Sequence, residues 1–123
     1  MVIRMSNPST SIATLEELRD ALQIFCAERD WHRYHTPKNL VMALSVEAAE
    51  LVEHFQWATP DESADLSAEK RAAVADEIAD VLIYLTELAA VLNIDMMDAA
   101  RRKMIKNAQK YPAPTDGKTD EPL

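Results

Sequence analysis

The sequence predicts an all-α protein, a four-helix bundle with a flexible C-terminal tail. Ala, Leu, Glu, Met and Lys dominate the 123 residues, and these are strong helix formers. Glycine occurs once, at Gly117, and the β-branched and aromatic runs expected of strands are scarce. Hydrophobic residues make up 48% of the chain, and a chain of this length supports one core rather than two. A single helical domain is therefore expected.

The first two helices are marked by capping signals at their N-termini. Thr14 and Glu17 form a capping-box pattern, in which a hydroxyl and a carboxylate three residues later satisfy free backbone N–H groups. Thr36 and Pro37 open the second helix as an N-cap followed by a proline in the first turn. We expect the first helix at residues 14–30 and the second at residues 36–57.

Two further helices follow a segment rich in turn-forming residues. Residues 58–66 hold a threonine, a proline, a serine and two aspartates, and are predicted to form a loop. Ser67 caps a third helix, expected at 67–93, and Asp95 caps a fourth, expected at 95–111. The expected organisation is a flexible N-terminus (1–12), one domain (13–111) and a flexible tail (112–123).

The net charge and the single cysteine exclude several classes of partner. A formal charge of −8 argues against binding to a nucleic-acid polymer, which requires clustered Lys and Arg. Cys26 is the only cysteine, so neither an intramolecular disulfide nor a thiolate metal site is expected. No stretch of roughly 18 apolar residues occurs, and residues 1–10 lack the apolar segment of a signal peptide. We therefore expect a soluble cytoplasmic protein that binds no membrane.

Two acidic pairs form the main chemical signal of the sequence. Glu47 and Glu50 lie three residues apart in the second helix, and Glu77 and Asp80 repeat this spacing in the third. Residues three apart project from the same face of a helix. Each pair borders an apolar stripe, so four carboxylates are expected to face the interior of the bundle. The stripes consist of Leu40, Leu44, Leu51 and Phe55 in one helix and of Val74, Val81, Leu85, Leu88 and Leu92 in the other.

Four converging carboxylates indicate a site for a hard divalent cation. Like charges in a low-dielectric interior repel one another unless a cation neutralises them, and carboxylate oxygens suit Mg²⁺, with Mn²⁺ as an alternative ion. The competing interpretation, two solvated surface faces, suits either pair alone but not two pairs that border apolar stripes. A di-iron site typically requires Glu-x-x-His motifs, and the sequence contains none.

The paired acidic motif resembles that of the MazG-like all-α nucleoside triphosphate pyrophosphatases. Further elements resemble the dCTP pyrophosphatase branch of that superfamily, and together they cover residues 14–112. One departure is Val46, where many members carry another glutamate before the first metal ligand. The elements are Glu28-Arg-Asp-Trp31, His35-x-Pro37-x-Asn39-Leu40, Phe55-Gln56-Trp57, Asp80-Val-Leu-Ile-Tyr84 and Lys103-Met-x-x-Asn107-x-x-x-Tyr111-Pro112.

The resemblance implies an activity and a ligand set. It implies hydrolysis of a deoxynucleoside triphosphate between the α and β phosphates, which gives the monophosphate and pyrophosphate. The substrates implied are dCTP and modified dCTP, in a role of nucleotide-pool sanitation. Mg²⁺ would be held by Glu47, Glu50, Glu77 and Asp80, and Glu47 or Glu50 would accept the proton of the attacking water.

Aromatic and polar side chains beside these motifs are candidates for substrate binding. Trp31 and Trp57 are suited to stacking on a base, and the alternative is that both fill the core. His35 and Asn39 are suited to reading a pyrimidine or a sugar hydroxyl, although His35 would otherwise cap a helix. Tyr84 lies one turn after Asp80 and is expected near the bound phosphates or sugar; otherwise it is a rim tyrosine.

The predicted fourth helix is basic within an acidic protein. Lys103, Asn107 and Tyr111 recur every four residues and form one polar ridge, which suits a triphosphate that needs counter-charge. The alternative is that cations late in a helix complement its dipole. We favour a phosphate-facing ridge.

Apolar side chains beyond the stripes indicate self-association. Their surface exceeds what one small bundle can bury, so we expect a homotetramer, with a homodimer as the alternative. Two other functional classes stay open: a related pyrophosphatase for dUTP or other non-standard nucleotides, and a non-catalytic helical interaction module. The apolar residues concerned are Met42, Ile83, Met96, Met97 and Met104.

Overall fold

The computed structural model describes residues 11–115, and these residues form helices joined by short connections, without a strand. The all-α prediction is confirmed. Most of the predicted flexible ends, 1–12 and 112–123, lie outside the described residues. The helices are α1 (Leu15–Glu28), the 3₁₀ helix η2 (His32–Tyr34), α2 (Pro37–Glu53), α3 (Pro60–Ala64), α4 (Ala68–Val91) and α5 (Met96–Lys110).

Side-chain caps begin every α-helix at the position that the sequence marks. The hydroxyl of Thr14 accepts a hydrogen bond from the backbone N–H of Glu17, and the caps at the start of α2, α4 and α5 bond in the same way. Each cap satisfies one of the backbone donors that a helix leaves free at its N-terminus. The four predicted caps, Thr14, Thr36, Ser67 and Asp95, are confirmed.

Two boundaries differ from the prediction. Helix α2 ends at Glu53, and the residues up to Trp57 form turns instead of continuing the helix. The predicted loop at residues 58–66 contains α3, so that prediction was wrong for five residues. The reason is another capping box: the Thr59 hydroxyl accepts from the Glu62 backbone N–H and donates to the Glu62 carboxylate, with a proline in the first turn.

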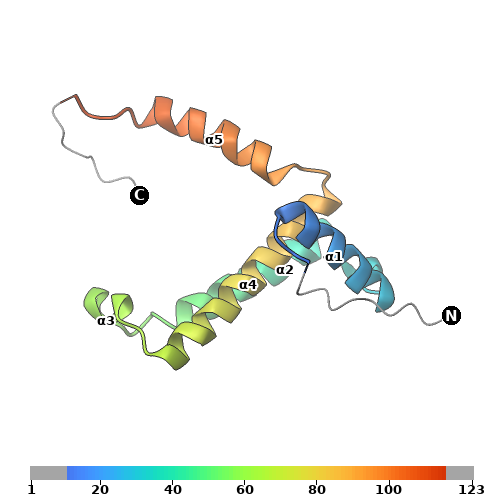
Figure 1. Cartoon of the computed structure of the whole chain (residues 1–123), viewed down its shortest axis with the longest axis horizontal. Coiled ribbons are helices and arrows are strands. Elements are labelled where there is room, and N and C mark those ends of the chain that lie inside the picture. The colour runs from blue at the N-terminus through green and yellow to red at the C-terminus, as the bar shows by residue number, and fades with distance from the viewer. Residues whose placement is uncertain (1–10, 116–123) are drawn as a thin grey trace. The chain divides into compact units, whose positions relative to one another are not determined.

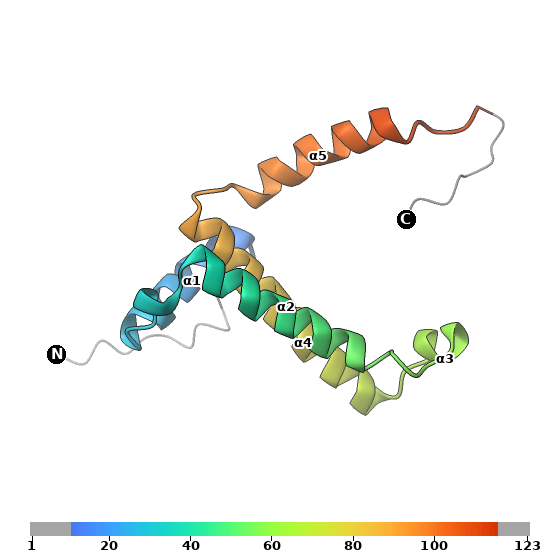
Figure 2. The same cartoon turned by 180° about the vertical axis from the view of Figure 1, so that it is seen from behind.

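The first structural unit, up to Asn93, is built around α2 and α4. These helices run side by side in opposite directions, and α1 packs against the C-terminal part of α4 (Figures 1 and 2). The buried apolar side chains come from all three helices, which places the core along α4. They are Cys26 of α1, Leu40 of α2, and Val74 and Ala89 of α4.

The second unit begins at Ile94, and its described part contains α5. Asp95 caps this helix, and Asp98 in its first turn forms ion pairs with Arg101 and Arg102 at 3.7 and 2.7 Å. Such pairs one turn apart stabilise an exposed helix by a few tenths of a kcal/mol each. Among residues 11–115, no helix is both long and apolar enough to cross a membrane.

Leu40 offers a test of the core. Its side chain is 1% exposed, so truncation leaves a cavity in the first unit. We expect Leu40→Ala to lower the free energy of unfolding by about 2–5 kcal/mol, measured by urea denaturation. Val41 is the next residue of α2 and is 49% exposed, so Val41→Ala serves as the control and should cost much less. Equal losses for the two variants would place the core elsewhere.

Candidate active site

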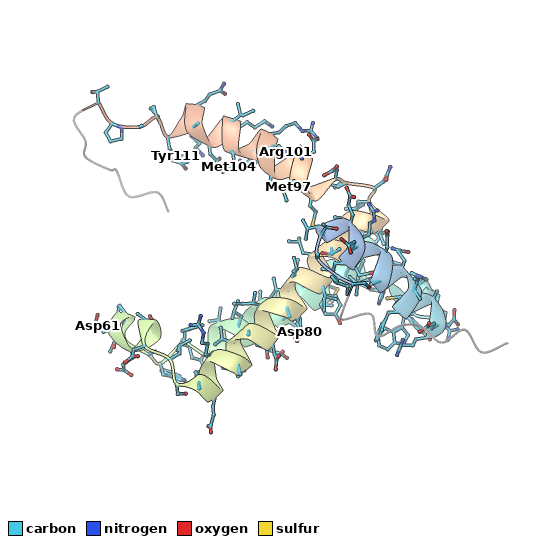
Figure 3. The ribbon with its side chains drawn as sticks, in the orientation of Figure 1. Asp61, Asp80, Met97, Arg101, Met104 and Tyr111 are labelled. Carbon is cyan, nitrogen blue, oxygen red and sulfur yellow. The ribbon has the colours of Figure 1, made fainter. Side chains whose placement is uncertain are left out.

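An acidic cluster lies between α2 and α4. We use this name for Glu47 and Glu50 of α2 together with Glu77 and Asp80 of α4, which the packing of these two helices brings together. Carboxylate oxygens of Glu47, Glu77 and Asp80 all lie within 4.8 Å of one another. Asp80 is labelled on α4 in Figure 3. Two sequence motifs, separated by the 26 residues between Glu50 and Glu77, therefore meet in one place.

Glu50 acts on its neighbours in the acidic cluster. It lies one turn after Glu47, and its charge, together with hydrogen bonding to the protonated carboxyl groups, raises the pKa of both Glu47 and Glu77. A carboxylate carries no donor, so two carboxyl groups can bond only when one of them holds a proton. The interaction with Glu50 therefore favours the protonated forms of Glu47 and Glu77.

Burial and mutual repulsion shift the acidity of the cluster. The pKa of Glu47 is raised to about 7. Burial is the largest cause, followed by the hydrogen bond and negative charge of Glu50 and then by the charges of Asp80 and Glu77. The pKa of Glu77 is also raised, by burial first and then by Glu50 and Asp80. Both groups thus hold protons more tightly than an ordinary carboxyl does.

The donor set fits a hard divalent cation. All four side chains are half-buried and offer only oxygen, the donor that Mg²⁺ and Mn²⁺ prefer. One oxygen of Glu47 and one of Glu77 are buried without a hydrogen-bond partner. A buried oxygen without a partner is costly, and a bound cation would supply the missing interaction.

His54 and Tyr84 complete the surroundings of the cluster. The imidazole Nε2 of His54 lies 4.0 Å from a carboxylate oxygen of Glu77, and its charge when protonated opposes the rise in the pKa of Glu77. His54 directly follows α2, and sequence reasoning gave it no role. Burial first, and then the charges of Glu47 and Asp80, raise the pKa of Tyr84. Its expected place near the bound phosphates or sugar stays a prediction.

Of the predicted base-binding residues, Trp31, His35 and Asn39 lie around the connector between α1 and α2, whereas Trp57 follows the other end of α2. Trp31 follows α1, and its ring packs edge-on against Phe25 at a centroid distance of 5.6 Å and lies 6.4 Å from the His35 ring. Trp31 is 44% exposed and Trp57 is 89% exposed, so the alternative that both tryptophans fill the core is wrong. The exposed faces of these two rings are available for stacking.

His35 and Asn39 are held by neighbours in the same part of the chain. Thr36 caps α2, so the alternative that His35 caps the helix is wrong; its Nδ1 instead lies 3.4 Å from the Glu87 carboxylate. The Asn39 amide donates to the Tyr34 carbonyl at 2.8 Å. Sequence reasoning missed Glu87, because nothing near it in the sequence marks a partner.

The polar ridge of Lys103, Asn107 and Tyr111 lies on α5 in the second unit (Figure 3 labels Tyr111). Within this unit, the Lys110 ammonium lies 5.4 Å from the centre of the Tyr111 ring, and the Tyr111 N–H donates to the Asn107 carbonyl at 2.8 Å. A phosphate-facing role for the ridge stays a prediction.

Together, the fold and the acidic cluster define an all-α protein with a carboxylate site suited to a divalent cation. A model of the MazG-like family matches residues 42–122. The chain belongs to the MazG-like family, and the resemblance drawn from its sequence motifs is confirmed.

Named relatives extend the comparison. The chain is 46% identical to human dCTP pyrophosphatase 1 over 102 residues, and the match covers 81% of this chain and 60% of the human protein. The bovine protein of the same name is 44% identical over 106 residues, 84% of this chain and 62% of that protein. The chain thus spans about 60% of the length of these relatives. The crystal structure of a pyrophosphatase from Archaeoglobus fulgidus is 47% identical, with a TM-score of 0.77, and the match covers 82% of this chain and 94% of that one.

The shifted acidity of Glu47 predicts how pH affects the metal-free protein. Its folded-state pKa of about 7 lies above the ordinary value of 4.5, so the folded protein binds more protons than the unfolded chain between these values. The contribution of Glu47 to stability is therefore full below about pH 4.5 and is lost as the pH rises through about 7. We expect Glu47→Gln to raise the melting temperature of the metal-free protein at pH 7.5 more than at pH 5.

The control is Asp76→Asn, which removes an exposed carboxylate of α4 outside the acidic cluster. Melting curves in a chelator at both pH values, followed by addition of Mg²⁺, provide the measurement. Mg²⁺ should stabilise the wild type more than Glu47→Gln. A melting temperature that Glu47→Gln lowers at pH 7.5 would contradict the repulsion described for the cluster.

Proposed function

We propose that this protein is a Mg²⁺-dependent nucleoside triphosphate pyrophosphohydrolase that converts dCTP and modified dCTP to the monophosphate and pyrophosphate, and so removes unwanted nucleotides from the pool. The observation that carries the proposal is the convergence of Glu47, Glu77 and Asp80 within 4.8 Å across two packed helices. The 46% identity to human dCTP pyrophosphatase 1 supports the choice of substrate.

The acidic cluster is the proposed cation site. Glu47, Glu50, Glu77 and Asp80 would hold Mg²⁺, with Mn²⁺ as a substitute, and the ion would neutralise charge on the phosphates and lower the pKa of a water molecule. The four carboxylates would leave the remaining coordination positions of the ion to water and substrate. They would thereby fix where the phosphates bind. The partnerless oxygens of Glu47 and Glu77 support this assignment.

A carboxylate of α2 is the proposed general base. Water attacks the α-phosphorus, a new P–O bond forms, and the bond from the α-phosphorus to the bridging oxygen breaks to release pyrophosphate. The proton of the attacking water passes to Glu47 or Glu50. Glu47 and Glu50 lie one turn apart in α2, so whichever of them is less committed to the ion would be placed to accept this proton.

The nucleoside would lie beside the cluster, toward the connector between α1 and α2. Trp31 would stack on the base, a contact worth about 1–3 kcal/mol. Trp57 follows the other end of α2, so it would stack on a base only in a site completed by a second copy of the chain. His35 and Asn39 would read polar edges of the base or sugar, and Tyr84 would contact the sugar or phosphates. Lys103, Asn107 and Tyr111 of α5 would supply further phosphate contacts.

Self-association in the cytoplasm completes the proposal, with a homotetramer as the first choice and a homodimer as the second. Met42 and other large apolar side chains of α2 and α4 are exposed in the single chain. A mainly apolar groove on these helices supports burial against a second copy. The groove is lined by Leu51, Val52, Phe55, Gln56, Val74 and Ile78.

A nucleotide panel tests the proposed reaction. We expect the protein with Mg²⁺ to release pyrophosphate from dCTP and 5-substituted dCTP in preference to dUTP, dTTP and purine nucleotides, and we expect no release in a chelator. Chromatography of the products identifies the monophosphate. Preference for dUTP or a purine nucleotide would show that dCTP is not the preferred substrate. No turnover of any nucleotide would favour a helical interaction module.

Variants of the cluster accompany that assay. Glu47→Gln and Asp80→Asn should each lower kcat/KM by about 100-fold or more, because loss of a metal ligand costs at least as much as loss of an outer-shell partner. Asp76→Asn should keep wild-type activity, and circular dichroism should show the same helical content in all three. Near-normal rates in either cluster variant would exclude the residue concerned as a ligand.

A further inference from the structure

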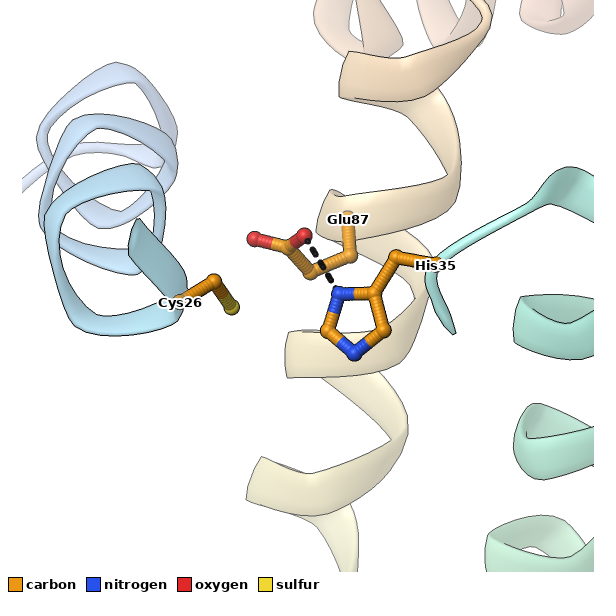
Figure 4. A group of neighbouring side chains, drawn as sticks. All are labelled: Cys26, His35 and Glu87. Atoms are coloured by element: carbon orange, nitrogen blue, oxygen red, sulfur yellow. Dashed lines mark ion pairs between the residues drawn. The ribbon is translucent and has the colours of Figure 1, made fainter. Parts of the chain in front are cut away.

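A second cluster of metal-binding side chains lies apart from the acidic cluster. Cys26 of α1, His35 after η2 and Glu87 of α4 point toward one another (Figure 4). Sγ of Cys26, a ring nitrogen of His35 and a carboxylate oxygen of Glu87 all lie within 4.8 Å of one another. Three separate segments thus bring together three different donor types, and this cluster shares no residue with the acidic cluster.

The buried carboxylate of Glu87 lacks the partner that its position in this second cluster requires. It is 2% exposed, and neither of its carboxylate oxygens has a hydrogen-bond partner. Nδ1 of His35 lies 3.4 Å away but also makes no hydrogen bond, and the two form an ion pair only when the imidazole is protonated. A buried carboxylate with two unpartnered oxygens is strongly unfavourable unless a cation lies beside it.

The donor chemistry selects the kind of cation. Thiolate, imidazole and carboxylate are the ligands of Zn²⁺, whereas Mg²⁺ takes oxygen ligands and does not favour sulfur. A tetrahedral zinc ion holds its ligand atoms roughly 3.3–3.8 Å apart. The 3.4 Å between His35 Nδ1 and the Glu87 carboxylate already falls in this range, and Sγ of Cys26 lies within 4.8 Å of the other two donor atoms.

We propose that Cys26, His35 and Glu87 form a second metal site, for a borderline-soft divalent cation of the Zn²⁺ type. Three protein ligands leave the fourth position of a tetrahedral ion for water. On binding, the Cys26 thiol loses its proton to solvent and bonds to the ion as thiolate. This proposal departs from the sequence-based expectation that no thiolate metal site exists, because one thiolate suffices when imidazole and carboxylate provide the other ligands.

The site gives zinc a route to control the protein. A zinc ion held by His35 withdraws this ring from the base or sugar, so zinc would lower turnover at saturating Mg²⁺. This consequence rests on the proposed function, but the metal site itself does not, because it follows from the geometry of residues outside the acidic cluster.

Cobalt(II) absorption tests the site on the whole, untagged wild-type chain. Because Cys26 is the only cysteine, a thiolate-to-cobalt charge-transfer band identifies it as a ligand without any substitution. With excess Mg²⁺ present for the acidic cluster, we expect one Co²⁺ per chain with this band and with the intense visible bands of tetrahedral cobalt, all displaced by Zn²⁺. Absence of the charge-transfer band at saturating Co²⁺ would overturn the proposal. No nucleotide is present, so failure of the proposed pyrophosphatase activity leaves the result unchanged.

Two variants and a control complete the experiment. Glu87→Gln should weaken zinc binding, measured by competition with a chromophoric chelator, by about tenfold or more. Cys26→Ser should lose the charge-transfer band, and Glu47→Gln, which alters only the acidic cluster, should keep both the band and the zinc affinity. Zinc affinity unchanged by Glu87→Gln would exclude Glu87 as a ligand and overturn the three-residue site.

Discussion

Repulsion among buried carboxylates is the constraint that organises the first structural unit. Helices α2 and α4 pack through apolar stripes, and the same packing brings the acidic cluster together. The free energy gained from apolar burial therefore opposes the cost of crowding negative charge, and the pKa of Glu47, raised to about 7, records that cost. A cation removes the conflict. In its absence the raised pKa values favour protonation of Glu47 and Glu77, and the site that we propose for catalysis lowers the stability of the metal-free fold.

Local signals account for what the sequence predicted well. A cap such as Thr36 depends on the few residues that follow it, and the i, i+3 spacing of Glu77 and Asp80 fixes a shared helix face whatever the helix packs against. The sequence also predicted that the two acidic faces meet in one cluster, because the apolar stripe beside each face determines how the two helices pack. The missed α3 carries the same local signal as α2, a threonine cap before proline, so its omission was an error of interpretation.

The second cluster shows what local patterns cannot reveal. Glu87 lies in an apolar part of α4, and its partners come from a different helix and a connector more than 50 residues earlier. No spacing rule links three such positions, because their meeting depends on how α1 packs against α4. The same limit applies to His54, because its imidazole lies near the Glu77 carboxylate only after α2 and α4 pack. The residues that the sequence left without a role are those whose neighbours are set by tertiary structure.

The backbone after α1 and after α4 turns through the left-handed region without glycine. Asp30 has a φ of 54° and Asn93 a φ of 55°, and these are among the few side chains that tolerate such angles. A glycine at either place would relieve local strain but would also widen the range of conformations open to the denatured chain. The single glycine of the chain lies outside both of these turns. The denatured chain therefore samples a narrower range of conformations and loses less conformational entropy when it folds.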